Sequence, residues 1–311
     1  MPLPFLLIGA AVAVAGASSG IRGAKKMKEA NEIVEAANGK FNRAKELMEA
    51  KQALAEEKLE SYGRLKYEIW TGDFNRFIKA YEVIQNKPRF TGSLKKDELV
   101  IPPEEELELQ EIASGARKIF EKTAGAALFG ILGWSGTLGG ISFAGGSIVS
   151  TGFGLMSGAS IIGGIAGGPL MAFQGILMNY KGEKSLEKAR EIEENADEAI
   201  HKLNELKGLY SKLAVCTDKM AGEVTKTRSS FLQYLDSFEN TVKHKSEYSA
   251  LTFGEKKTLE CTYLYLKVLK AMLNISIIKQ EDNRCAMDEN AGSLLENAVR
   301  ERDAIGSGLE L

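Results

Sequence analysis

The residues that most often carry enzyme chemistry are few in this chain, and they lie far apart in the sequence. The only two histidines are His201 and His244, and neither has an aspartate, cysteine or second histidine that completes a catalytic triad or a zinc site. The three cysteines, Cys216, Cys261 and Cys285, form no C-x-x-C pair. No G-x-x-x-x-G-K-[ST] loop is present to hold nucleotide phosphates. We therefore expect no catalytic residue, no metal and no cofactor.

Two short patterns imitate enzyme motifs without their structural context. The stretch Gly16–Ile21 resembles the glycine turn of short-chain dehydrogenases, but Arg22 stands where that family has its last glycine. The Y-x-x-x-K spacing of the same enzymes occurs at Tyr62…Lys66 and at Tyr263…Lys267. A dinucleotide turn needs a βαβ unit, and a long helical pattern follows instead. The G-x-S-x-G string within Gly16–Ile21 likewise lacks the strand–turn–helix of a nucleophile elbow. Glycine packing on a helix explains these residues more simply than catalysis.

The most unusual feature is a stretch from Thr123 to Tyr180 that contains no Asp, Glu, Lys, Arg or His. Lys122 and Lys181 flank it, and it holds half of the 32 glycines of the chain. An uncharged run longer than about 18 residues is a candidate membrane span, and this one is long enough for two spans and a turn. Small residues recur four apart, which lets helices pack closely in a membrane. The predicted packing positions of this hairpin are Gly146, Ser150, Gly154, Gly158, Gly164 and Gly168.

A second interpretation of the same stretch stays open. Glycine costs about 1 kcal/mol per residue relative to alanine in a helix, and it adds little hydrophobic drive. A tightly packed helical hairpin buried inside a soluble bundle would have the same composition. A marginal segment of this kind suits a protein that hides it in one state and inserts it in another.

The N-terminal residues 1–21 form a third apolar segment, and a basic cluster follows it. No Lys or Arg precedes Arg22, so the basic region of a secretory signal is absent, although Ala13-Val14-Ala15 resembles a cleavage site. Under the positive-inside rule, the side that carries the cluster stays in the cytoplasm. The basic flank consists of Arg22, Lys25, Lys26 and Lys28.

Heptad periodicity predicts long helices on both sides of the uncharged stretch. In residues 22–70, apolar residues fall seven apart from Met27 to Ile69, and Lys51 and Lys58 interrupt the second row. In residues 181–245 the signal is stronger, with Thr217 and Thr227 as its weak points. Similar lengths favour antiparallel packing of these two helices. The expected organisation is as follows: an apolar segment at 1–21, a heptad helix and a short amphipathic helix at 22–85, a linker at 86–103, a helix at 104–122, the glycine-rich hairpin at 123–180, a heptad helix at 181–245, a helix at 252–280 and a polar tail at 281–311.

Local signals mark three helix boundaries. Thr71-Gly72-Asp73 predicts a break with Asp73 as an N-cap, and Thr252 with Glu255 has the spacing of a capping box. Glu104, Glu105 and Glu106 follow Pro103 and are expected to form the solvated first turn of a helix. The predicted fold class is all-α, an elongated bundle of long coiled-coil-like helices with a glycine-rich apolar helical hairpin.

Charge and cysteine content narrow the classes of partner and compartment. Lys and Arg number 40 against 42 Asp and Glu, a formal net charge of −2, so no overall positive field favours nucleic acid. An odd number of widely spaced cysteines suits a reducing cytoplasm. We expect a cytoplasmic protein that is associated with the inner membrane or inserted into it.

The layout of long helices around an apolar hairpin resembles the α-helical pore-forming toxins of the cytolysin A type, without a shared motif. Gly167-Gly168-Pro169-Leu170 and residues 184–189 (Lys-Ser-Leu-Glu-Lys-Ala) also resemble a broad set of bacterial glycine-zipper proteins. The second resemblance implies a membrane-associated helical bundle and supplies no active residues. The first implies oligomerisation, with the N-terminal segment and the hairpin entering the bilayer.

These observations predict a membrane-inserting helical protein that forms a homo-oligomer, and pore formation in a toxin or immune system is the more specific hypothesis. The lipid bilayer is the expected partner. The alternative is a non-lytic membrane-associated scaffold whose coiled helices recruit a partner protein. An enzyme of unrecognised fold that depends on His201 or Cys216 is the third hypothesis.

Overall fold

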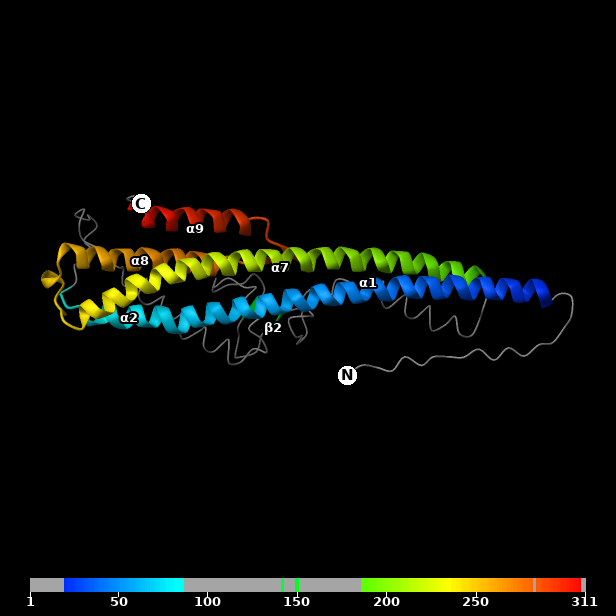
Figure 1. The fold of residues 1–311 in the computed structure, drawn as a ribbon, viewed down its shortest axis with the longest axis horizontal. Helices are drawn as coiled ribbons and strands as arrows, with labels where there is room; N and C mark the ends of the chain where they lie inside the picture. The colour runs from blue at the N-terminus through cyan, green and yellow to red at the C-terminus, as the bar shows by residue number, and fades with distance from the viewer. Residues whose placement is uncertain (1–19, 87–140, 143–148, 151–185, 282–283, 309–311) are drawn as a thin grey trace. The chain divides into compact units, whose positions relative to one another are not determined.

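The protein is all-α, with long helices that pack together. The computed structural model describes residues 20–86, 141–142, 149–150, 186–281 and 284–308. The main helices are α1 (Gly20–Glu68), α2 (Phe74–Val83), α7 (Leu186–Val242), α8 (Phe253–Asn274) and α9 (Ala291–Gly306). Two short turns accompany them, the π-helical η1 (Ile69–Asp73) and the 3₁₀-helical η2 (Tyr248–Ala250). The strands are β1 (Ile141–Ser142), β2 (Val149–Ser150), β3 (Ile278–Glu281) and β4 (Arg284–Met287), which form two antiparallel pairs, β1–β2 and β3–β4 (Figure 1).

The chain divides into two compact units. The first contains residues 1–47 and 166–205, and the second contains residues 48–165 and 206–311. In the first unit, the heptad prediction is confirmed over most of its length. Met27 is the exception, because its side chain is 42% exposed. The buried heptad side chains of this unit are Ala30, Val34, Ala37 and Phe41 on α1, and Ala189, Ile192, Ala196, Ala199 and Leu203 on α7.

In the second unit, the first predicted heptad row of α1 is confirmed, because Ala55, Tyr62 and Ile69 are buried. The second row is wrong there, because the buried positions between them are Leu59 and Lys66, each one residue later than a strict seven-residue repeat places them. A straight helix drifts about 20° per heptad, so an apolar stripe that stays on one face shifts to a spacing of eleven residues. Ala55 and Lys66 are eleven residues apart. The second row of the prediction is wrong because it extended a strict seven-residue repeat through this part of α1.

The α1–α2 arm and α7 run in the same direction within the second unit (Figure 1). Ion pairs and hydrogen bonds join Lys58 to Asp218, Arg76 to Asp236 and Asn86 to Glu247. In every such pair between the two arms, the residue numbers differ by 155 to 163. A constant separation means that the two helices advance together, whereas antiparallel helices would give a constant sum. The predicted antiparallel packing is therefore wrong. Heptad patterns do not encode direction, and these polar pairs do.

α8 folds back on α7 after the η2 turn. The residue numbers of the contacts increase along α7 as they decrease along α8. The Thr227 hydroxyl lies 3.4 Å from the sulfur of Met272, and the ring of Tyr234 stacks on that of Tyr265. The two threonines predicted as weak points of α7 are fully buried, and each hydroxyl donates to the carbonyl oxygen four residues earlier, at Leu213 for Thr217 and at Glu223 for Thr227. The buried hydroxyls are thus satisfied inside the helix.

The capping box at the start of α8 is confirmed. The Thr252 hydroxyl accepts from the Glu255 backbone N–H, and the Glu255 carboxylate accepts from the Thr252 N–H. The polar tail predicted at 281–311 is wrong, because α9 occupies most of it and packs on α8. The apolar stripe of α9 is Ala291, Leu295, Ala298 and Ile305, and Arg302 stands within it. We missed this helix because small residues and one charge hide its period.

Candidate functional site

The predicted hairpin falls almost wholly outside the described residues. This applies to Gly146, Gly154, Gly158, Gly164 and Gly168, to residues 1–19, and to the predicted linker and helix at 87–122. Ser150 is the exception. It lies in β2 and pairs with Ile141 of β1, so the helical expectation is wrong at the four residues of this strand pair. Ile141 and Val149 are β-branched, which favours extended backbone at these positions.

The basic flank lies at the start of α1. Lys25, Lys26 and Lys28 are exposed on the first turns of the helix, and the Lys28 ammonium is 3.8 Å from the Glu32 carboxylate one turn later. Arg22 is in the same helix. The structure therefore places all four cations on one helix end. Among the described residues, no helix is both long enough and apolar enough to span a bilayer.

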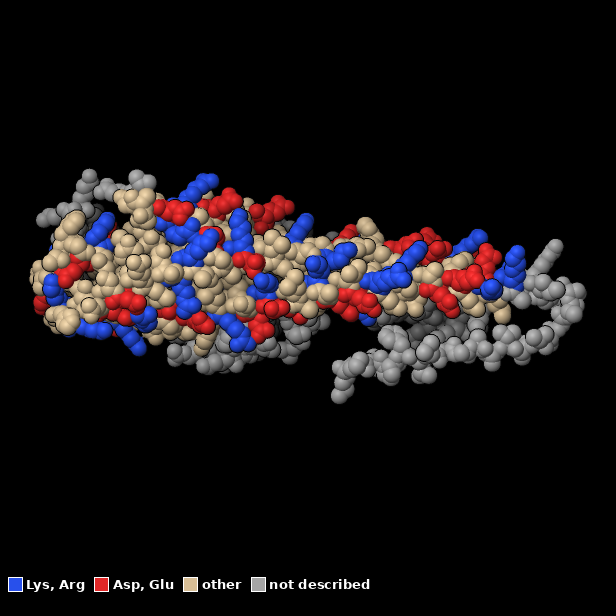
Figure 2. All heavy atoms as spheres, viewed as in Figure 1, with Lys and Arg blue, Asp and Glu red and all other residues tan. Residues whose placement is uncertain are grey.

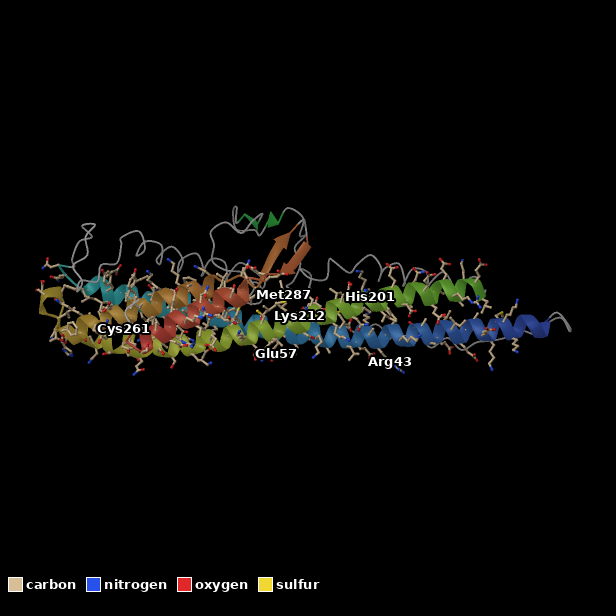
Figure 3. All side chains as sticks on the ribbon, turned by 90° about the horizontal axis from the view of Figure 1, so that it is seen from above. Arg43, Glu57, His201, Lys212, Cys261 and Met287 are labelled. Carbon is tan, nitrogen blue, oxygen red and sulfur yellow. The ribbon has the colours of Figure 1, made fainter. Side chains whose placement is uncertain are left out.

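The histidines occupy surface positions. His201 projects from α7, and its Nε2 lies 3.2 Å from the Glu205 carboxylate (Figure 3). His244 is exposed in the turn after α7. Within the described part of the chain, His, Cys, Asp and Glu do not gather into a group that could hold a metal ion. Burial raises the pKa of the Cys216 and Cys261 thiols, which disfavours the reactive thiolate form at both positions.

The most unusual polar group of the second unit is the buried pair Tyr62 and Lys66 on α1. Both side chains are 1% exposed, and the Lys66 ammonium lies 4.8 Å from the centroid of the Tyr62 ring. These residues have the Y-x-x-x-K spacing noted in the sequence, and one turn of helix brings them together. Removal of Lys66 from water lowers the pKa of its amine to about 7, because burial disfavours the charged form.

Tyr62 has a second unusual property. Its hydroxyl is fully buried and makes no hydrogen bond in the structure, while burial, with a smaller effect of Cys216 on α7, raises its pKa well above the usual value for tyrosine. A buried hydroxyl without a partner costs about 1–3 kcal/mol. The core of this unit therefore contains two groups that both oppose folding, one turn apart on the same helix.

The π-helical turn η1 follows this pair and carries an ion cluster. Asp73 does not cap α2 as the sequence predicted. The helical backbone continues from α1 through η1 into α2, and the Asp73 side chain makes no capping hydrogen bond. Its carboxylate instead accepts from Nε of Arg228 on α7, at 2.6 Å, and Nη1 of Arg228 also reaches Glu68 at 3.0 Å. Single π-turns often occur at functional sites. Here the extra residue turns Asp73 toward α7.

Aromatic packing surrounds the far side of this turn. Trp70 and Phe74 meet edge to face with centroids 5.0 Å apart, and Phe74 meets Phe231 of α7 at 6.0 Å. Further along, Phe77 contacts Phe238 of α7 and Tyr263 of α8. The aromatic residues of α2, Phe74, Phe77 and Tyr81, are thus core residues. The Asp73–Arg228 ion pair is adjacent in sequence to this aromatic cluster, because Asp73 directly precedes Phe74.

The chemical capability of this region is limited by access. An amine with a pKa of about 7 can act as a base or a nucleophile, but Lys66 is almost completely buried and presents no free surface to a substrate. Protonation of the Lys66 amine instead destabilises the folded state, in which the amine is buried, relative to any state in which it reaches water. The sequence predicted Tyr62 as a core position of the heptad row, and the structure confirms it. Lys66 was missed, whereas the apolar spacing around it (Leu59, Tyr62, Ile69) marks its position as part of the core.

No family model, curated protein or solved structure matches this chain.

Proposed function

We propose that this protein is a conditional membrane-inserting helical protein that oligomerises in the bilayer, with the glycine-rich stretch as the inserting hairpin and pore formation as the outcome. The single observation that carries the proposal is the run of 58 residues from Thr123 to Tyr180, which has no ionisable side chain other than its own tyrosine. Runs of that length without Asp, Glu, Lys or Arg are rare outside membrane proteins.

The topology of the second unit supports the proposal. The end of α2 lies beside residue 247, because Gln85 donates to the Ser246 carbonyl and accepts from Tyr248. Since α2 and α7 run in the same direction, α2 ends at the opposite end of this unit from the residues of α7 that enter it first. Residues 206 and 242 of α7 are about 54 Å apart, at 1.5 Å per residue. The 99 residues between Asn86 and Leu186 join these two ends, and the uncharged stretch lies among them.

The buried pair Tyr62 and Lys66 supports a conditional rather than a permanent membrane state. A core that holds a lysine and an unsatisfied hydroxyl is less stable than its apolar area implies. An inserting protein needs such a metastable soluble form, because it must give up packing to expose its hairpin. We expect the soluble form in the cytoplasm and the inserted form in the inner membrane.

The test is release of a trapped dye from liposomes by the purified protein. We expect the native protein to release dye and the variant Gly154→Asp to release at least tenfold less, since an aspartate in a membrane-inserted segment is costly, up to about 2.5–3.5 kcal/mol at the centre of a span. The matched control is Gly222→Asp. Gly222 is exposed on α7 with open space around its α-carbon, so the same change there leaves release unaltered.

Two results would contradict the proposal. Equal release by the native protein and the Gly154→Asp variant would show that the hairpin does not insert. Vesicle binding without release would favour the non-lytic scaffold, for which the 71% exposure of Val215 on α7 is the supporting observation, as an uncovered apolar contact for a partner protein.

A further inference from the structure

The turn between α7 and α8 presents an aromatic side chain to solvent. Phe253 is the first residue of α8, and it is 79% exposed, more than any other large apolar side chain in the part of the chain that the structure describes. A single exposed apolar residue is ordinary on a protein surface. Phe253 differs because the backbone beneath it is fixed and because cations surround it in the sequence.

The fixed backbone comes from four sets of contacts. Tyr248 and Leu251 are buried and anchor the turn from below. The strand-like bridge between Gln85 and Glu247 ties the turn to the end of α2. The capping box of Thr252 and Glu255 holds the first turn of α8. Lys245 then holds the Glu255 carboxylate at 2.7 and 2.8 Å. Phe253 is therefore presented at a defined position, and little entropy is lost when it is buried by a partner.

In this turn the acidic side chains have partners, whereas several basic side chains have no acidic partner. Each nearby carboxylate has a partner: Glu247 accepts from Asn86, Glu255 from Lys245, and Glu260 lies 2.9 Å from Lys257. Within the described residues, no carboxylate lies within ion-pair distance of three basic side chains. These are Lys243, His244 and Lys256, and the Lys256 ammonium lies over the ring of Tyr248 at 4.7 Å. An exposed aromatic beside lysines that have no carboxylate partner is the composition of a membrane-surface contact.

We propose that the turn between α7 and α8, residues 243–257, docks on an anionic lipid surface, with Phe253 entering the headgroup region and Lys243 and Lys256 contacting anionic headgroups. The inference rests on the proposed membrane function and gives it a first point of contact outside the glycine-rich stretch. A bilayer fits this surface better than a protein partner does. Phe253 is the only apolar residue in the stretch 252–257 (Thr-Phe-Gly-Glu-Lys-Lys), whereas the core of a protein interface is a cluster of apolar and aromatic side chains.

The experiment measures co-sedimentation of the full-length protein with vesicles of phosphatidylcholine and phosphatidylserine, and with vesicles of phosphatidylcholine alone. We expect Phe253→Ser to raise the lipid concentration needed for half-binding by about 10-fold to 100-fold, the equivalent of burying one phenylalanine. The pair Lys243→Gln and Lys256→Gln should raise it by about 10-fold or more on anionic vesicles and leave binding to neutral vesicles unchanged. The matched control is Val215→Ser, which removes a similarly exposed apolar side chain from α7.

A direct readout uses Phe253→Trp in a Trp134→Phe background, which leaves Trp70, buried in the core, as the only other indole. Brominated lipids should quench the fluorescence of the indole at position 253 if this turn enters the headgroup region. Far-ultraviolet circular dichroism and thermal unfolding of each variant show that the fold is retained, as expected for changes at exposed positions.

The outcomes separate this inference from the proposed function. Unchanged binding by Phe253→Ser, or absence of quenching at position 253 while the native protein still releases dye, would overturn docking by this turn and leave the hairpin proposal intact. Binding that depends on Phe253 but not on anionic lipid would overturn the role of the lysines, and capture of a protein rather than vesicles by the same residue would overturn the lipid assignment. Two results together would support both proposals: weaker vesicle binding by Phe253→Ser but not by Val215→Ser, and loss of dye release in Gly154→Asp. If the native protein binds no vesicles at all, both proposals fail.

Discussion

Replacement of Lys66 by methionine should stabilise the protein at neutral pH and flatten the dependence of its stability on pH. The amine has a pKa of about 7 in the folded protein and about 10.5 in an unfolded chain. Because the folded pKa is the lower one, the unfolded state binds the proton more readily, and folding becomes less favourable as pH falls from 10.5 to 7. Below pH 7 both states are protonated and the penalty is constant.

The size of the effect follows from the two pKa values. A difference of 3.5 units at 1.36 kcal/mol per unit is a full penalty of about 5 kcal/mol, of which about 4 kcal/mol is present at pH 7 and about 1.5 kcal/mol at pH 9.5. Methionine has a similar length and no charge, so Lys66→Met removes the penalty. The free energy of unfolding of the variant minus that of the native protein should therefore fall by about 3 kcal/mol between pH 7 and pH 9.5.

The assay is urea denaturation at several pH values, followed by circular dichroism. Use of the difference between variant and native protein cancels the titration of the cysteines and tyrosines, which the two share. Lys267→Met is the matched control, because Lys267 also lies over a tyrosine ring one turn away, that of Tyr263, but is exposed on α8. A difference between the Lys66 variant and the native protein that does not change with pH would refute the reasoning, and so would a variant that is less stable at pH 7.

Two further predictions concern contacts that fix the helices. Arg228→Met should lower the free energy of unfolding by about 3 kcal/mol, because it leaves the buried Asp73 carboxylate without its cation. The double variant with Asp73→Asn should recover most of this loss. Additive losses in the double-mutant cycle would contradict this prediction. Thr252→Ala should lower the free energy of unfolding by about 1 kcal/mol, because it removes the N-cap of α8. The control Ser249→Ala, an exposed substitution in the same turn, should lower it much less. Equal losses in thermal or urea unfolding would exclude the cap as the cause.

The sequence predicted the helices well where apolar residues repeat without interruption. The all-α class and the capping box of Thr252 follow from local patterns, and the structure confirms them. The burial of Val34 and Phe41 on α1 and of Leu203 on α7 follows from the heptads. Figure 2 shows acidic and basic side chains interspersed on the visible surface, as expected for helices whose outer positions alternate in charge.

The two main failures share one cause. On α1 the buried positions are 55, 59, 62, 66 and 69, and on α9 the inward-facing positions are 291, 295, 298, 302 and 305. Both sets have the spacing of one helix face, and in both the fourth member is a cation, Lys66 or Arg302. On α1 the prediction included positions 55, 62 and 69 and missed 59 and 66, whereas on α9 it missed the whole helix. A charge at a core position hides that position from a pattern of apolar residues. Arg302 is explained by its bonds to Glu223 on α7, a partner that lies 79 residues away in the sequence and that no local pattern could identify.

The direction of α7 relative to α1 was lost for a related reason, and it bears most on function. A heptad row has the same appearance whichever way its partner runs, so only the pairing of particular charges, such as Lys58 with Asp218 and Arg76 with Asp236, sets the direction. An antiparallel pair could be closed by a short loop. A parallel pair cannot, because the chain must return along its own length before α7 begins. The parallel arrangement therefore requires a long connection between Asn86 and Leu186, and the uncharged run lies within that connection. Single charges such as Gly154→Asp, which leave the length of the connection intact, are the cleaner test of what the run does.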